Sequence, residues 1–164
     1  MTGLSDVQRS FVLHSGQGDA TWFLGTLMTV KAGDAATRSA YTLIEFQAPS
    51  GFAPPRHIHH DEDEAFYILE GALRIECGDQ TWTIGPGAFV FLPRGIPHTF
   101  TVEGDSPMRA LQLTSPAGFE QFAAEVGEPA AAPTLPPPAA PDVQKLLAAA
   151  QKHSIQILPP RAGS

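Results

Sequence analysis

The segment from Gly51 to Gly71 constrains this chain more than any other, because it sets two histidines ahead of an acidic run between two glycines. His57 and His59 are two positions apart, and residues with that spacing point to the same face of a β-strand. Glu64 has the opposite parity, so the acidic residues before it must form a turn or bulge that resets the register. The sequence therefore predicts strands that bring two imidazoles and a carboxylate together.

A second segment, from Gly87 to His98, adds a third histidine after a turn rich in proline and glycine. Imidazole is a good ligand for Zn, Cu, Fe and Ni, and a carboxylate adds a hard anionic ligand. Three imidazoles and one carboxylate from neighbouring strands therefore predict a site for one divalent transition metal. The candidate metals are Fe, Mn, Ni, Co, Cu and Zn, and the sequence leaves the choice among them open.

The two segments also fit known sequence motifs. Residues 51–71 fit G-x5-H-x-H-x(3,4)-E-x6-G at every fixed position, and residues 87–102 fit G-x5-P-x-G-x2-H-x3-N except for Val102 at the last. These are the two cupin motifs, so the chain resembles the cupin superfamily, and within it small single-domain proteins of the quercetinase (quercetin 2,3-dioxygenase-like) type. The asparagine that Val102 replaces is not a ligand in that family. The resemblance implies these metal ligands: His57, His59, Glu64 and His98.

Short apolar or alternating segments, separated by turns with Gly, Pro and Asp, predict an all-β fold. The expected strands cover residues 11–13, 22–30, 41–48, 73–77, 80–84, 89–92, 98–102 and 108–114. Together with the resemblance, this pattern implies a cupin jelly-roll β-barrel over residues 1–116.

The composition changes after residue 116, and residues 117–164 predict a C-terminal extension. Apolar residues at helical spacing predict a helix over 119–126. Most residues from 129 to 141 are Pro or Ala, which predicts a stiff, extended linker. Asp142 is suited to cap a second helix over 143–152, and a short strand is expected over 155–158.

Length and charge narrow the function classes. A chain of 164 residues suits one domain with a sizeable core. The formal net charge of −7, without a basic cluster, excludes nucleic acids and anionic membranes as expected partners. Cys77 is the single cysteine, which rules out an internal disulfide and fits a reducing cytoplasm. The first residues lack the apolar core of a signal peptide, so a cytoplasmic location is expected.

The ligand set and the resemblance together indicate an enzyme. Four protein ligands leave one or two positions on a five- or six-coordinate metal, where a small-molecule substrate and O2 can both bind. We therefore expect a metal-dependent oxidoreductase, a dioxygenase acting on an enol or a phenolic, flavonol-like molecule. In that comparison Glu64 is both a ligand and the acceptor of the substrate's hydroxyl proton. Two alternatives stay open: an isomerase or lyase that uses the metal as a Lewis acid, and a small-molecule-binding cupin without turnover.

Three further expectations concern residues around this site. His60 lies beside His59 with the wrong parity for the shared face, so a surface or supporting role is expected. The acidic residues 61–63 are expected to form a solvated turn. The aromatic residues expected mostly in the core are Trp22, Tyr41, Phe46, Phe66, Phe91 and Phe100.

The sequence also predicts an assembly state. Residues 41–46 and the strands before them carry apolar side chains on both faces, more than one small barrel can bury. We therefore expect a homodimer.

Overall fold

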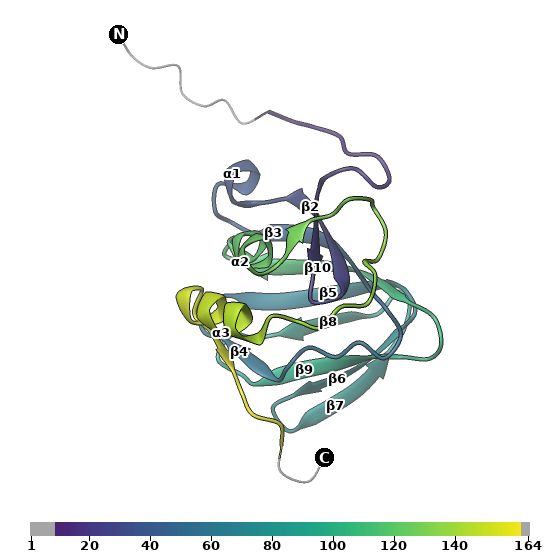
Figure 1. Cartoon of the computed structure of the whole chain (residues 1–164), viewed down its shortest axis with the longest axis vertical. Helices are drawn as coiled ribbons and strands as arrows, with labels where there is room; N and C mark the ends of the chain where they lie inside the picture. The colour runs from purple at the N-terminus through teal and green to yellow at the C-terminus, as the bar shows by residue number, and fades with distance from the viewer. Residues whose placement is uncertain (1–8, 162–164) are drawn as a thin grey trace.

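Two antiparallel β-sheets lie face to face in the computed structural model, which describes residues 9–161 (Figure 1). The larger sheet has the order β11-β1-β2-β3-β10-β5-β8. Its strands are β1 (Asp19–Phe23), β2 (Thr26–Ala32), β3 (Thr42–Ala48), β5 (Asp63–Glu70), β8 (Phe89–Leu92), β10 (Met108–Ser115) and β11 (Glu128–Pro129). The smaller sheet has the order β12-β4-β9-β6-β7. Its strands are β4 (His57–His59), β6 (Ala72–Cys77), β7 (Gln80–Ile84), β9 (His98–Glu103) and β12 (Ile155–Ile157).

Alternation of apolar and polar side chains explains why these strands form a sandwich. In β3, every second residue is buried, and the same period of two runs through β9 and β10. The buried side chains of both sheets meet in one core, to which the larger sheet gives Phe46 and Ile68 and the smaller sheet gives Ile75. The predicted all-β jelly-roll arrangement is therefore confirmed.

The expected closure into a barrel is wrong. Strands β8 and β11 end the larger sheet, and β7 and β12 end the smaller one, so no hydrogen-bonded ladder joins the two sheets within residues 9–161. Side-chain packing between the inner faces holds the layers together in place of ladder hydrogen bonds. The outermost parts of the expected barrel and extension, residues 1–8 and 162–164, lie outside the described residues.

Two predicted strands near the N-terminus are also wrong. Residues 11–13 form no strand, and the outer edge of β1 pairs with β11 instead. Phe11 and Val12 are consequently 56% and 75% exposed. The single strand expected over 22–30 is instead the hairpin β1–β2, whose turn contains Leu24 and Gly25, both with positive φ. Such a turn matches the twist of a hairpin, and Gly25 was the signal for it.

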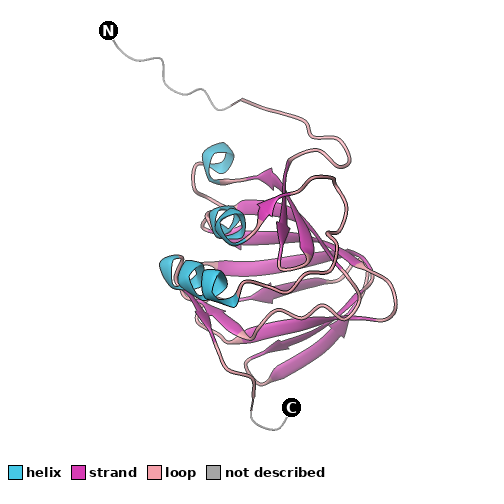
Figure 2. Ribbon diagram, viewed as in Figure 1, coloured by secondary structure: helices cyan, strands magenta, loops and turns pink. Residues whose placement is uncertain are grey.

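The C-terminal helices lie on the same side of the sandwich (Figure 2). The helix α2 spans Phe119–Val126 and α3 spans Val143–Lys152, as their sequence patterns predict. The helix α2 packs against β1 and β3, and α3 packs against β12. Asp142 caps α3 by accepting a hydrogen bond from the backbone N–H of Lys145 at 3.0 Å. A third, short helix, α1, spans Asp34–Thr37. The strand β12 then pairs with β4, so the end of the chain becomes part of the smaller sheet.

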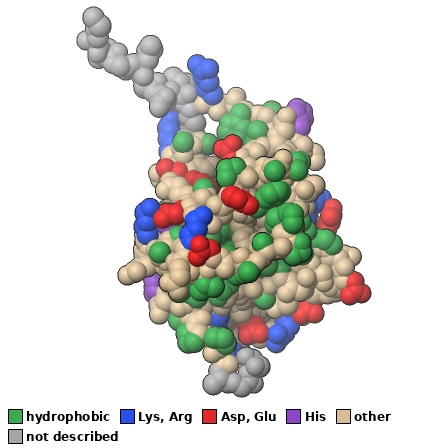
Figure 3. Space-filling view, in the orientation of Figure 1, with side chains coloured by type: hydrophobic (Ala, Val, Ile, Leu, Met, Phe, Trp, Pro, Cys, Tyr) green, Lys and Arg blue, Asp and Glu red, His purple; other side chains and the backbone are tan. Residues whose placement is uncertain are grey.

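The hydropathy of the helices and the distribution of surface charge can be compared with the expectation that membranes and nucleic acids are not partners. Of the helices in residues 9–161, none combines the length and the hydropathy that crossing a lipid bilayer requires. On the face drawn in Figure 3, Lys and Arg side chains are scattered among acidic ones and form no basic patch. This distribution agrees with the net charge of −7.

The expected aromatic core is only partly correct. Phe46, Phe66 and Phe100 are buried, whereas Tyr41 and Phe91 are 40% and 54% exposed. Phe91 projects from the outer face of the edge strand β8, whose inner residues Val90 and Leu92 occupy the core instead. The alternation of a strand sends neighbouring residues to opposite faces, so residue type alone did not decide which aromatic side chains are buried.

The homodimer stays a prediction, and the outer face of the larger sheet gives it a test. Tyr67, Phe89 and Phe91 lie there on paired strands and are 45%, 64% and 54% exposed. We expect light scattering at micromolar concentration to give twice the 17.4 kDa mass of the chain. A charge in this apolar face, Phe91→Asp, should shift that mass towards the monomer, while Val143→Asp on α3 should not. A monomeric wild-type chain would contradict the prediction.

Candidate metal centre

The four residues of the predicted site come from three strands in two different sheets. His57 and His59 lie on β4 and His98 begins β9, and His57 pairs directly with His98. Glu64 lies on β5 in the other sheet, because residues 60–62 carry the chain across between β4 and β5. The reset of register that the acidic run required is thus a change of sheet. It lets Glu64 face the histidines across one end of the sandwich.

Each histidine is oriented by a bond at its Nδ1 atom. The Nδ1 of His57 lies 2.7 Å from the carbonyl oxygen of Pro55, and the Nδ1 of His98 lies 3.0 Å from that of Ile96. A carbonyl oxygen can only accept, so each of these Nδ1 atoms carries a hydrogen and donates it. In its neutral form each ring therefore presents a lone pair at Nε2. The neutral imidazole is the form that binds a metal.

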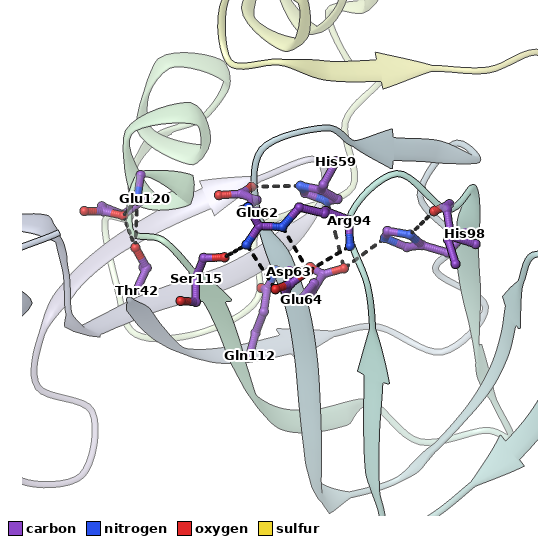
Figure 4. A network of polar contacts seen from close by, with 12 residues as sticks. Thr42, His59, Glu62, Asp63, Glu64, Arg94, His98, Gln112, Ser115 and Glu120 are labelled. Carbon is purple, nitrogen blue, oxygen red and sulfur yellow. Dashed lines mark hydrogen bonds and ion pairs between the residues drawn. The ribbon is translucent and has the colours of Figure 1, made fainter. Parts of the chain in front are cut away.

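The Nδ1 atom of His59 is held by a carboxylate. It lies 2.8 Å from Oε1 of Glu62, which fixes the tautomer of His59 in the same way (Figure 4). A carboxylate in this position also raises the basicity of the imidazole it contacts. Residues 61–63 were expected to form a solvated turn rather than extra ligands; Glu62 is no member of the ligand cluster, but its carboxylate is held against His59 and its side chain is only 13% exposed. Its position three residues after a candidate ligand was the one signal in the sequence.

The ligand atoms converge as a bound cation would require. One donor atom from each of His57, His59, Glu64 and His98 lies within 4.8 Å of the other three. Oε2 of Glu64 is 3.0 Å from Nε2 of His98 and 3.9 Å from Nε2 of His59. Two ligands at about 2.1 Å from one ion are separated by about 3–4 Å, depending on the angle between them. The donor set therefore fits a divalent transition metal.

An orphaned polar atom supports the same fit. Nε2 of His59 is buried and has no hydrogen-bond partner among residues 9–161. A buried polar atom without a partner costs free energy, so it calls for an explanation. A metal ion bound to Nε2 would satisfy it.

The buried charges at the site shift two pKa values downward. Burial, and after it the positive charges of His98 and His59, together lower the pKa of His57 to about 4. Burial by itself would raise the pKa of Glu64, but the hydrogen bond with His98 and the charges of the imidazoles hold it at about 2. Glu64 is therefore ionised and His57 neutral at neutral pH, which is what a metal site needs.

The pKa of His59 moves the other way. Burial by itself would lower it, but the hydrogen bond to Glu62 and the charges of Glu64 and Glu62 raise it above 6.5. Because a metal binds only the neutral imidazole, protons compete for His59 at higher pH than for an ordinary histidine. Metal affinity should consequently weaken as the pH falls through the raised pKa.

Gln112, on β10, is a site residue that the sequence reasoning missed. Its Nε2 donates a hydrogen bond of 2.6 Å to Oε1 of Glu64 (Figure 4). The other carboxylate oxygen, Oε2, is the one near His98 and His59. Gln112 therefore orients the carboxylate so that Oε2 faces the histidines. A glutamine in an alternating strand gives no sign of this role until β10 and β5 are known to pair.

An apolar cavity adjoins three of the four residues. His57, His59 and Glu64 line one part of it, and aromatic rings from both sheets line much of the rest, including Phe46, Phe66 and Phe100. His60 lies outside this cavity, exposed, with Nε2 3.1 Å from Oε1 of Gln156. The surface role expected for His60 is confirmed.

Comparison with known proteins agrees with the fold and with the site. A model of the family described as "Cupin domain" matches residues 44–114, which contain all four candidate ligands. A curated relative, the quercetin 2,3-dioxygenase of Bacillus subtilis, is 26% identical over 129 residues. Residues 44–114 of the chain therefore match the cupin family, and the fold agrees with that match.

The similar proteins align with different fractions of this chain and of their own length. The alignment with the Bacillus subtilis dioxygenase covers 79% of this chain but only 38% of that enzyme. The solved structure of KdgF from Halomonas sp. has a TM-score of 0.59 at 17% identity and covers 69% of this chain and 98% of that one. A predicted oxalate decarboxylase from Thermotoga maritima has a TM-score of 0.58 at 19% identity, over 64% of this chain and 98% of that one. These structural likenesses establish the fold and not the reaction.

Replacing Glu62 tests how this cupin tunes His59. In the metal-free chain, Glu62→Gln should lower the pKa of His59, because a neutral amide no longer stabilises the imidazolium. A raised folded-state pKa stabilises the fold below pH 6.5, and that contribution is lost as the pH rises through the raised value. The variant should therefore lose stability on the acidic side. NMR titration of the histidine ring protons measures the pKa values.

The matched control is Glu125→Gln, which removes the carboxylate 2.9 Å from Nε2 of His153 and is not among the groups that shift the pKa of His59. It should leave the titration of His59 unchanged. An unaltered pKa of His59 in Glu62→Gln would show that Glu62 does not tune this imidazole.

Proposed function

We propose that this cupin binds one divalent transition metal through His57, His59, Glu64 and His98, and that it is an oxidoreductase. More specifically, we propose a dioxygenase that acts on an enol or phenolic small molecule. One observation carries the proposal: three imidazole Nε2 atoms and a buried carboxylate converge at the wall of an apolar cavity. The Bacillus subtilis relative supports the oxidoreductase class, at 26% identity.

The metal, its ligands and the aromatic walls have different roles in the proposed reaction. A bound divalent metal supplies a Lewis acid and, when redox-active, a place for the substrate and O2 to meet. Three neutral imidazoles and one carboxylate leave a divalent ion with one net positive charge, which favours an enolate or phenolate. The aromatic walls exclude water and receive the apolar body of the substrate. Exclusion of water also strengthens the attraction between opposite charges inside the cavity.

Glu64 has two possible roles in the proposed reaction. As a ligand it contributes Oε2, and as a base it takes the hydroxyl proton of the substrate at the same atom. The hydrogen bonds to both of its oxygens and a pKa of about 2 make it a weak base in the metal-free chain. These contacts favour a second candidate function, in which Glu64 is a ligand only and the metal acts as a Lewis acid for an isomerase or lyase.

The metal assignment is tested by removing one ligand. His59→Ala should lose most of the bound metal, because within residues 9–161 the cluster holds only the imidazoles of His57, His59 and His98 and offers no fourth one as a replacement. Elemental analysis of the purified protein measures the metal content and identifies the metal. The control is His60→Ala, which removes the neighbouring exposed imidazole and should keep full metal content. Full metal content in His59→Ala would overturn the assignment.

The two roles of Glu64 are separated by Glu64→Gln. Glutamine keeps the shape and one coordinating oxygen but accepts no proton at neutral pH. General-base catalysis contributes about 10²–10⁴-fold to a rate. If Glu64 is the base, kcat/KM should fall by that order while most of the metal stays bound.

The assay is oxygen consumption on a panel of phenols, enols and diketones. A wild-type rate in metal-containing Glu64→Gln would leave Glu64 as a ligand only. A non-oxidative rearrangement, with no oxygen consumed by any compound of the panel, would replace the dioxygenase with the Lewis-acid enzyme.

A further inference from the structure

The cavity beside the four ligands is small. It measures about 50 Å³. A cavity needs about 10–15 Å³ on this measure for each water molecule, so the space holds roughly three to five waters. Water in the liquid occupies about 30 Å³ per molecule, so those waters amount to about 90–150 Å³ of material, close to one six-membered ring. Typical ligand pockets are about 300–1,000 Å³, and a three-ring flavonol needs space of that order.

The C-terminal extension supplies one side of the cavity. Phe119 and Phe122 reach it from α2, Leu146 from α3, and Ile155 and Ile157 from β12. All of these lie after residue 116, outside the residues that match the cupin family model. The two sheets provide the ligands and the rest of the wall, and the extension closes it.

Phe119 occupies the central position in that closure. Its ring centre is 5.8 Å from that of His59, 5.5 Å from that of Phe122 and 6.2 Å from that of Phe23. The side chain is only 6% exposed, so it fills space directly beside a candidate ligand. Phe119 is therefore one of the side chains that set the size of the space beside His59.

A single layer of side chains separates the inner cavity from a second pocket nearer the surface. Phe119, Phe122 and Ile155 also line a second, more polar pocket of about 200 Å³, whose other walls include Glu62, Lys152 and His153. The same three side chains therefore separate the inner cavity from this outer pocket. If they were shortened, the two spaces would join.

We propose that the extension determines the substrate size of this cupin, and that Phe119 and Phe122 restrict the site to a compact substrate of about one ring. The proposal rests on the proposed function, because it names the size class of substrate that the site accepts. It narrows the enol or phenolic class and excludes fused or multiple-ring flavonols. Shortening Phe119 opens the inner cavity towards the outer pocket and admits a second ring.

The test compares two probes that differ by one ring, phenol and 2-naphthol. Binding is measured by calorimetry and by NMR on the full chain, both metal-free and loaded with redox-inert Zn²⁺. In an open apolar site the second ring buries more surface and strengthens binding. We expect the wild-type chain to show the opposite, with phenol bound at least tenfold more tightly than 2-naphthol. Phe119→Ala should bind 2-naphthol at least tenfold more tightly than the wild type, with little change for phenol.

Two further variants keep this test decisive. Truncating a buried ring destabilises a fold, so Phe119→Leu is included as a milder change and should give an intermediate preference. The matched control is Phe89→Ala, which truncates a 64% exposed ring on the outer face of the larger sheet and should behave like the wild type. Thermal unfolding of each variant establishes that the folded state is being compared.

Two results would overturn the proposal: tight binding of 2-naphthol to the wild-type chain, or an unchanged probe preference in both Phe119 variants. Failure of the proposed function would look different. A chain that takes up no metal but still prefers phenol over 2-naphthol keeps the size limit and loses the metal site. A chain that binds metal but shows no size preference keeps the metal site and loses the size limit.

Discussion

The structure around the site depends on one electrostatic constraint, the burial of Glu64 against three imidazole rings. A buried carboxylate is costly unless positive charge or hydrogen-bond donors compensate it. Gln112 satisfies one oxygen, and His98 and His59 lie near the other. One donor atom from each histidine lies close to the Glu64 carboxylate, and this arrangement suits a cation bound among them.

This constraint explains why two sheets are needed. The three histidines lie on paired strands of the smaller sheet, and Glu64 and Gln112 lie on paired strands of the larger one. Packing of the two inner faces brings these two sets of residues together. The geometry of the site therefore depends on the packing of the core. The C-terminal strand β12 pairs with β4 along His57 and His59, which ties the extension to the ligands.

The C-terminal extension contributes part of the wall of the cavity beside the candidate ligands. The sheets of a cupin supply ligands and an apolar interior, and fold alone does not specify a reaction. In this chain the rings and aliphatic side chains after residue 116 close the interior down to a cavity of about 50 Å³. The proposed choice of a compact substrate therefore depends on segments outside the residues that match the family model.

Local sequence patterns determined much of this protein. The spacing of His57 and His59, the glycine and proline turns and the alternation of apolar residues predicted the candidate ligands, most strands and both C-terminal helices. These features depend on neighbours in sequence, which is why they were readable. Only the tertiary structure decided that residues 22–30 form a hairpin, that residues 11–13 form no strand, and that the sheets do not close into a barrel. It alone placed Glu62 and Gln112 against ligands and Phe119 against His59, because those contacts join side chains whose proximity depends on turns, strand pairing and sheet packing.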